Sequence, residues 1–364
     1  MKGLIWLRSA ATAFLIVSLL ASIGLGQHEP TREDDPCAVP GMRTDERPPA
    51  GGEATQPVGG EATPGAEGEA TKVTIAMQLL DLDEIDDIKQ RLTGDFEVFV
   101  NWTDSRLAKL AGCQVPLNEI WSPNITFLNS GQLRAERPQE VDITEGGQVQ
   151  YIQRYQGTLS TYHNLQRFPF DEQIFRISLL SSEYGEKDVL LVANDKLTGV
   201  WDRLNISDWQ IGGVKPAISR LYSKFEDTTY SLYDFEISAD RITAFYVWKV
   251  IVPLSLIVFM SWTVFWINPA QFGPQIQISA TSMLTVIAFQ FATAQMLPEL
   301  GYFTVLDLFI TGAIILVFLA MMESLITSYL VSKERSKVAQ RIDLLCRMAF
   351  PFTFVALIFC VFFL

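Results

Sequence analysis

The chain of 364 residues is 49% hydrophobic and 12% aromatic, and its formal net charge is −13. Residues 241–364 carry seven basic and five acidic side chains, so the excess of acid lies before them. An acidic surface repels nucleic acid and attracts cations, and we expect no nucleic-acid partner. With two histidines, four scattered cysteines, no glycine-rich phosphate loop and no nucleophile–base set, the sequence predicts no metal site, no cofactor and no enzymatic activity.

Residues 1–26 have the composition of a secretory signal peptide, with two basic residues and an apolar run; a retained membrane anchor is the alternative. Residues 27–71 are rich in Gly, Pro, Glu, Ala and Thr, which bury too little apolar surface to fold, so we expect a disordered tail. Cys37 lies in this tail and Cys113 has no evident partner. We therefore predict no disulfide framework.

Residues 72–240 show the two-residue period of β-strands. In FEVFVNW (96–102), Phe96, Val98, Val100 and Trp102 share one face, which indicates a half-buried strand. Similar runs recur between Gly-rich turns, so we predict an all-β antiparallel sandwich in which Trp102 packs in the core.

An all-α region of four apolar segments follows, each long enough to cross a lipid bilayer: 245–267, 275–297, 303–330 and 342–364. The connection 331–341 contains four Lys or Arg residues, which marks the cytoplasmic side. This orientation places the β domain outside. We expect a multi-pass protein of the inner cell membrane with a periplasmic or extracellular N-terminal domain.

The second apolar segment is unusually polar for a lipid-facing helix. One helical face of this segment reads Gln277, Thr281, Leu284, Ala288, Phe291 and Gln295. Several copies around an axis would line a water-filled pore, whose polar ends replace ion hydration and whose apolar middle closes by dewetting. The alternative is a helix–helix seam joined by small and polar residues.

Three sequence motifs resemble those of one known protein family. RFPFDEQIF (167–175) resembles the signature loop of the pentameric ligand-gated ion channels, the Cys-loop receptor family. NWTDSRL (101–107) resembles the Trp-x-Asp-x-Arg-Leu strand end of that family, and IWSPNITF (120–127) resembles its Trp-x-Pro loop. The resemblance runs from about residue 72 to the end of the chain. It implies a β-sandwich outer domain, four membrane helices and a homopentamer around a central pore.

One departure from the family pattern concerns the signature loop. The two cysteines of that loop would fall at Thr161 and Phe175, so its disulfide is absent, as in the bacterial branch. We expect packing of Phe168 and Phe170 to hold the loop instead.

The resemblance implies that the second helix lines the pore. Gln277 would form the cytoplasmic constriction, Thr281 the next ring, Leu284 the hydrophobic gate and Phe291 an outer apolar ring. The segment AQFGPQ before this helix has neither the Glu usual in cation channels nor the Arg usual in anion channels. The acidic outer domain favours monovalent cations as permeating ions, although salt screens that field within about 10 Å.

The resemblance also places a small-molecule agonist between subunits. Aromatic faces attract organic cations and a carboxylate adds charge pairing, so an amine is one candidate and protons are the alternative. The expected site residues are Glu97, Phe99, Asn124, Glu183, Tyr184, Tyr222, Phe225 and Tyr230. The alternative is that the tyrosines only pack their hairpin.

Coupling between the two domains is expected at their junction, where Asp171 and Arg241 match positions that pair in the family. The acidic residues of the first hairpin that can join them are Asp83, Glu84, Asp86 and Asp87, of which we choose Asp86. The other residues implied are the signature-loop residues Phe168, Pro169, Phe170 and Asp171, then Arg241 and Pro298. Two rivals to a ligand-gated channel are a membrane-anchored receptor without a pore and a secondary transporter. A transporter would usually need more helices and inverted repeats.

Overall fold

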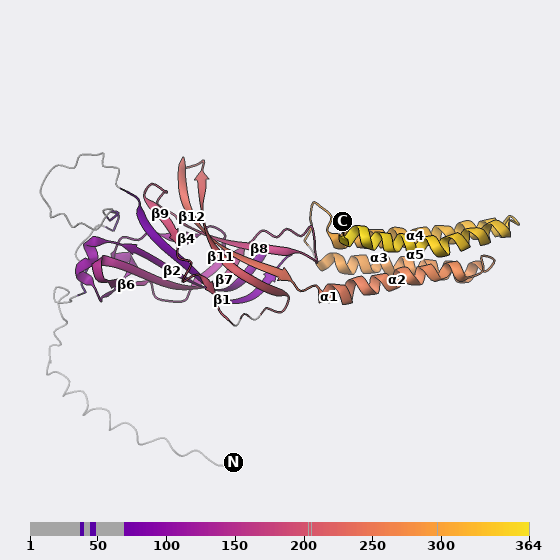
Figure 1. Cartoon of the computed structure of the whole chain (residues 1–364), viewed down its shortest axis with the longest axis horizontal. Coiled ribbons are helices and arrows are strands. Elements are labelled where there is room, and N and C mark those ends of the chain that lie inside the picture. Colours follow the sequence, from indigo (N-terminus) through magenta and orange to yellow (C-terminus); the bar gives the residue numbers. More distant parts are fainter. Residues whose placement is uncertain are drawn as a thin grey trace, which may run out of the picture.

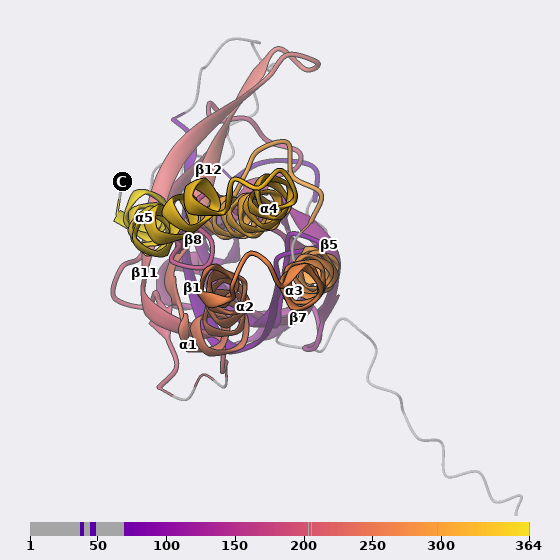
Figure 2. The same ribbon diagram turned by 90° about the vertical axis from the view of Figure 1, so that its right-hand side faces the viewer.

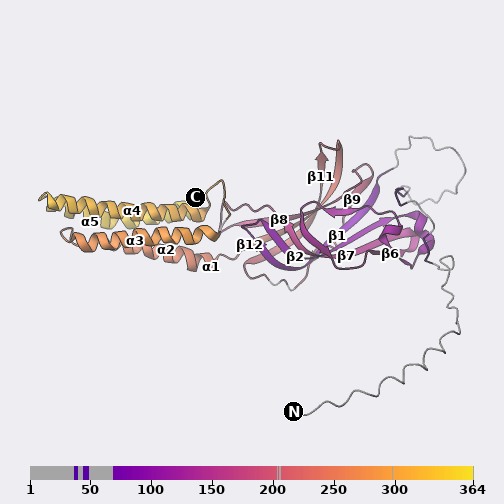
Figure 3. The same ribbon diagram turned by 180° about the vertical axis from the view of Figure 1, so that it is seen from behind.

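The computed structural model describes residues 37–39, 44–48, 69–202, 204, 206–296 and 298–363. The predicted signal peptide and most of the predicted tail lie outside these residues. The described chain is elongated, with a β domain at one end and a bundle of helices at the other (Figures 1 and 3). The predicted order of an all-β sandwich followed by four apolar helices is confirmed.

Two sheets form the β domain. The larger has the strand order β10-β1-β2-β7-β6-β3, with β5 on β7 and β9 on β1, and the smaller has the order β11-β12-β8-β4. The strands are β1 Thr71–Asp86, β2 Arg91–Thr103, β3 Gln114–Pro116, β4 Ile125–Phe127, β5 Ser130–Ala135, β6 Glu140–Thr144, β7 Gln148–Ser160, β8 Glu172–Ser181, β9 Val189–Ala193, β10 Gly199–Val200, β11 Trp209–Ser223 and β12 Thr228–Arg241.

The core of the β domain lies between the two sheets and follows from strand periodicity. Phe96, Val98, Val100 and Trp102 of β2 are at most 2% exposed, whereas Glu97, Phe99 and Asn101 on the opposite face are partly exposed. The expectation of a purely antiparallel sandwich was wrong in one respect. Strands β9 and β10 pair with β1 in parallel, because the chain crosses from the smaller sheet to reach this edge.

Four membrane-length helical spans follow: Ala244–Trp266, Phe272–Met296, Val305–Ser332 and Ser336–Phe363. Their α-helices are α1 Ala244–Tyr246, α2 Val252–Trp262, α3 Phe272–Thr293, α4 Val305–Ser332 and α5 Ser336–Phe363. Helix α5 begins at Ser336 and α4 ends at Ser332, so the basic connection is much shorter than the predicted segment 331–341. Figure 2, a view along the bundle, shows α3 beside α2 and α4.

The segment predicted as a disordered tail is tied to the β domain at two points. Cys37 and Cys113 form a disulfide, contrary to the prediction, and join positions 76 residues apart. The guanidinium of Arg47 donates to the carbonyl and carboxylate of Asp188, each at 2.9 Å. Both contacts fix described parts of this segment against the sandwich, and Val39 packs on its core.

Candidate functional sites: pore helix, domain junction and outer cavity

The polar residues of α3 divide into two faces. All six residues of the predicted pore stripe are exposed on the single chain: Gln277, Thr281, Leu284, Ala288, Phe291 and Gln295. Leu284 is 70% exposed and Phe291 is 72% exposed, so neither belongs to the core of its own subunit. This stripe is free to face a shared axis.

The other polar face of α3 lies inside the subunit. Gln275, Ser279, Ser282 and Thr293 are at most 5% exposed. The side-chain amide of Gln275 donates to the Ile267 carbonyl at 3.2 Å, and the hydroxyls of Ser279 and Ser324 on α4 are 3.4 Å apart. Small and polar residues therefore do form a helix–helix seam, but on the face opposite the stripe.

Arg241, the last residue of β12, lies at the centre of the domain junction. Its side chain is 2% exposed and donates to both oxygens of Asp171, at 2.8 and 3.0 Å. It also donates to both oxygens of Asp87, at 2.6 and 3.0 Å. The guanidinium stacks on Trp209 at 4.1 Å and on Phe168 at 4.8 Å. Two bidentate pairs thus link β12, the signature loop and the β1–β2 turn.

The structure corrects the choice of acid in the first hairpin. The carboxylate of Asp86 accepts a hydrogen bond from Lys89 at 2.8 Å, and it is the neighbouring Asp87 that pairs with Arg241. Burial alone would raise the pKa of Asp87. Hydrogen bonds from His163 and Arg241 outweigh burial and lower that pKa.

His163 takes the place of the absent loop disulfide. Its Nε2 lies 2.7 Å from the Thr161 hydroxyl, and its ring contacts Phe175 with centroids 5.0 Å apart. These are the two positions that the family resemblance assigns to cysteines. The Nδ1 of His163 lies 2.9 Å from Asp87, so one buried imidazole connects both positions to the Arg241 cluster. The expectation that Phe168 and Phe170 hold the loop omitted this residue.

The signature loop also binds the helical bundle. The carbonyl of Phe168 accepts from the Leu306 amide at 3.2 Å, at the beginning of α4. The ring of Phe170, which is 41% exposed, meets Phe362 near the end of α5 at 5.5 Å. Pro169 lies between Phe168 and Phe170 in the sequence. Pro298 lies in the connection between α3 and α4, where it lines a separate cavity.

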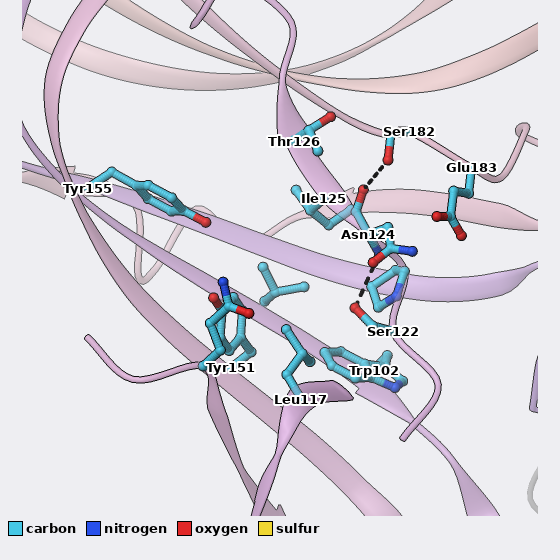
Figure 4. A pocket seen from close by; sticks show the side chains of 13 residues that line it. Trp102, Leu117, Ser122, Asn124, Ile125, Thr126, Tyr151, Tyr155, Ser182 and Glu183 are labelled. Carbon is cyan, nitrogen blue, oxygen red and sulfur yellow. Dashed lines mark hydrogen bonds between the residues drawn. The ribbon is translucent and has the colours of Figure 1, made fainter. Parts of the chain in front are cut away.

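A cavity of about 320 Å³ opens between the Trp-x-Pro loop and β7 (Figure 4). Asn124 and Glu183 lie on one side of it, and the carbonyl of Asn124 accepts from the hydroxyl of Ser182 at 3.2 Å. Tyr151 and Tyr155 of β7 lie opposite. Sequence reasoning missed these two tyrosines, because the two-residue period of β7 does not show which tyrosine borders a cavity.

The remaining predicted ligand residues do not reach this cavity. Tyr184 is half-buried, and its hydroxyl accepts from the Trp121 indole at 3.1 Å. Tyr222 donates to Asp227 at 2.6 Å, Phe225 is 97% exposed, and the Tyr230 hydroxyl donates to Glu226 on the β11–β12 hairpin.

Glu97 and Phe99 belong to the other sheet. The carboxylate of Glu97 accepts a hydrogen bond from the guanidinium of Arg137. Neither Glu97 nor Phe99 lines the cavity, and neither does any residue of the β11–β12 hairpin.

Comparison with known proteins settles the family. A family model described as neurotransmitter-gated ion-channel ligand binding domain matches residues 60–243, about half of the chain, and one described as the neurotransmitter-gated ion-channel transmembrane region matches residues 250–337. The chain belongs to the neurotransmitter-gated ion-channel family.

The relatives of this chain are named after different stimuli, and one of them is named as a chloride channel. A proton-gated ion channel of Gloeobacter violaceus is 26% identical over 294 residues, which are 78% of this chain and 80% of that protein. A gamma-aminobutyric acid receptor subunit beta of Caenorhabditis elegans is 26% identical over 73% of this chain and 50% of its own length. A pH-sensitive chloride channel 2 of Anopheles gambiae is 24% identical over 68% of this chain and 42% of its own length. The chain thus spans half or less of these two animal relatives.

As a member of this family the protein is a multi-pass membrane protein of the ion-channel class and not an enzyme. Because these relatives differ from one another in stimulus and one of them is a chloride channel, the stimulus and the permeating ion of this protein depend on its own residues.

Proposed function

We propose that this family member is a homopentameric ligand-gated channel of the inner membrane, with its β domain on the periplasmic side and its pore lined by α3. One observation carries the proposal. The six stripe residues of α3 are exposed on the single chain, although buried polar residues of the same helix bond within the subunit. A stripe of amides, a hydroxyl and bulky apolar groups suits water and passing ions better than lipid.

Adjacent cysteine substitutions test this pore. In a background without the free Cys346 and Cys360, T281C is expected to react with a charged thiol reagent that then blocks current. S282C, one residue away on the buried face, is the matched control and is expected to stay unmodified. Equal reactivity of the two positions, or labelling of T281C in a protein that passes no ions, favours the receptor without a pore.

We propose that the permeating ions are monovalent cations. The outer domain is acidic, and the mouth of α3 bears an amide at Gln277 with no charged side chain in the whole helix. An acidic vestibule raises the local cation concentration by steering, most strongly at low salt. Reversal potentials in asymmetric NaCl test this: a shift toward the chloride equilibrium potential contradicts the proposal.

We propose that an agonist binds between subunits, under the β11–β12 hairpin of one and against β2 of the next. The fully exposed ring of Phe225 and the half-exposed ring of Tyr222 offer aromatic faces, and Glu97 on the other sheet offers a carboxylate. An organic amine fits this pairing. Dose–response curves with a panel of amines are expected to move to higher concentration in F225A and E97Q. Equal curves for wild type and both variants contradict this site.

Protons are a second candidate stimulus, favoured by a cluster of carboxylates on β1 and β2. Burial, with the nearby charges of Asp81 and Asp95, raises the pKa of Asp83. Asp83 therefore takes up a proton more readily than an ordinary aspartate as the outer pH falls. Currents evoked by outer pH steps should then weaken in D83N and persist in D142N, an exposed aspartate on β6. Unchanged proton responses in D83N refute Asp83 as the sensor.

A further inference from the structure

Two carboxyl side chains are buried between α4 and α5, inside the membrane-spanning part. Glu323 is 8% exposed and Asp343 is 1% exposed. None of their four carboxylate oxygens has a hydrogen-bond donor among the described residues. The two carboxyl groups nevertheless lie within hydrogen-bonding reach of each other. Two acceptors can form that bond only when one of them carries a proton.

The charges around the pair indicate which carboxyl holds the proton. Arg347 lies one turn beyond Asp343 on α5 and acts on it electrostatically, while its guanidinium Nε donates to the Phe265 carbonyl at 2.8 Å. Cys346 on α5 is the other titratable neighbour of the pair. Helices α2 and α3 carry no charged side chain. The other charged residues of α4 and α5 lie nearer the helix ends, namely Asp307, Lys337 and Arg341.

We propose that Glu323 and Asp343 form a proton-binding site, in which the protonated carboxyl of Glu323 donates a hydrogen bond to the carboxylate of Asp343. With one proton the pair and Arg347 are together neutral. Without it, two like charges would face each other away from water, which is strongly unfavourable. The site joins α5 to the rest of the bundle while the proton is bound.

The position of the site connects it to the lower pore. Ser324 is the residue after Glu323, and its hydroxyl oxygen lies 3.4 Å from that of Ser279 on α3. In the sequence, Ser279 stands between the stripe residues Gln277 and Thr281. Glu323 is nine residues from the end of α4, about 14 Å along the helix axis. In the proposed orientation the proton therefore exchanges with the cytoplasm. Its release adds charge at the α4–α5 contact and loosens the support of α3.

Infrared spectroscopy of the purified full-length protein in liposomes tests the site without ion flow. The wild type at neutral pH is expected to show the carbonyl stretch of a buried protonated carboxyl group, and E323Q is expected to lose it. The matched control is E299Q, because Glu299 is exposed in the α3–α4 connection. The amide of E323Q still donates to Asp343, so the variant should fold. Absence of the band in wild type overturns the proposal, and a band lost in D343N but kept in E323Q overturns the placement of the proton on Glu323.

The consequence for gating is tested in inside-out patches and rests on the proposed channel function. Cytoplasmic alkalinisation is expected to lower the open probability of the wild type and of E299Q, and E323Q is expected to lose this dependence. A wild type insensitive to cytoplasmic pH overturns the gating role. A wild type that passes no current overturns the channel proposal, while the infrared result still decides whether the proton site exists.

Discussion

The Arg241 cluster is the strongest energetic link between the two domains, and R241Q measures it. The substitution leaves the carboxylates of Asp171 and Asp87, with side chains only 2% and 12% exposed, without their cation. Four charge-assisted hydrogen bonds of 2.6 to 3.0 Å are lost. Removing one partner of a buried ion pair costs about 3–5 kcal/mol, because the remaining charge stays desolvated.

Thermal unfolding of the purified protein measures this effect against a matched control. A loss of this size lowers the unfolding midpoint on the order of 10 °C, at roughly 2–4 °C per kcal/mol for a unit of this size. Arg176 also donates twice to one carboxylate, that of Glu236, at 2.7 and 3.1 Å, but it is 58% exposed. R176Q should therefore cost no more than about 1 kcal/mol.

The same variants separate coupling from folding. R241Q is expected to assemble, as checked by size-exclusion chromatography, and to give no stimulus-evoked current. R241Q/D171N should recover part of the lost stability, because one unpaired carboxylate is neutralised. Equal midpoints for R241Q and R176Q, or normal currents from R241Q, would refute the role of the buried cluster in coupling.

Three further substitutions test the pore, the N-terminal disulfide and the loop contact with α5. L284S should open the channel more readily, with half-maximal activation at an agonist concentration about tenfold lower, equivalent to ~1.4 kcal/mol. It should not lower the stability of the subunit, because the side chain of Leu284 is 70% exposed. C113S should lower the unfolding midpoint by the equivalent of about 2–4 kcal/mol, whereas C360S, an exposed free cysteine, should leave it unchanged. F170A removes the aromatic pair of Phe170 with Phe362, which is worth about 0.5–1.5 kcal/mol. It should shift the opening equilibrium roughly 2- to 12-fold toward the closed state. Single-channel recording measures this shift, with F352A as the control at an exposed aromatic residue.

Local periodicity made much of this fold predictable. The alternation in β2 marked Phe96 and Trp102 as core residues, because side chains of a strand alternate between faces whatever the partner strand. The helical period likewise placed Gln277, Leu284 and Phe291 on one face, and all three are exposed on the single chain. Both inferences need only the geometry of a single element.

The errors concern contacts between distant segments. Cys37 and Cys113 are 76 residues apart, and nothing in their spacing indicates that the chain brings them together. Asp86 and Asp87 are neighbours at a turn, where the backbone conformation decides which carboxylate faces Arg241. The partner of His163 also depends on tertiary packing, so a lone histidine gave no signal of its role.

The direction of the pKa shift at Asp87 limits where protons can act on this protein. Its pKa is lowered in the folded state, so its contribution to stability is present above its ordinary range, near 3.9, and is lost only as the pH falls through the lower folded value. Mild acid therefore leaves the carboxylate of Asp87 ionised and its hydrogen bonds with Arg241 in place. A proton stimulus must instead bind where a carboxyl group is more easily protonated, as at Asp83, and reach the pore through a junction that stays charged.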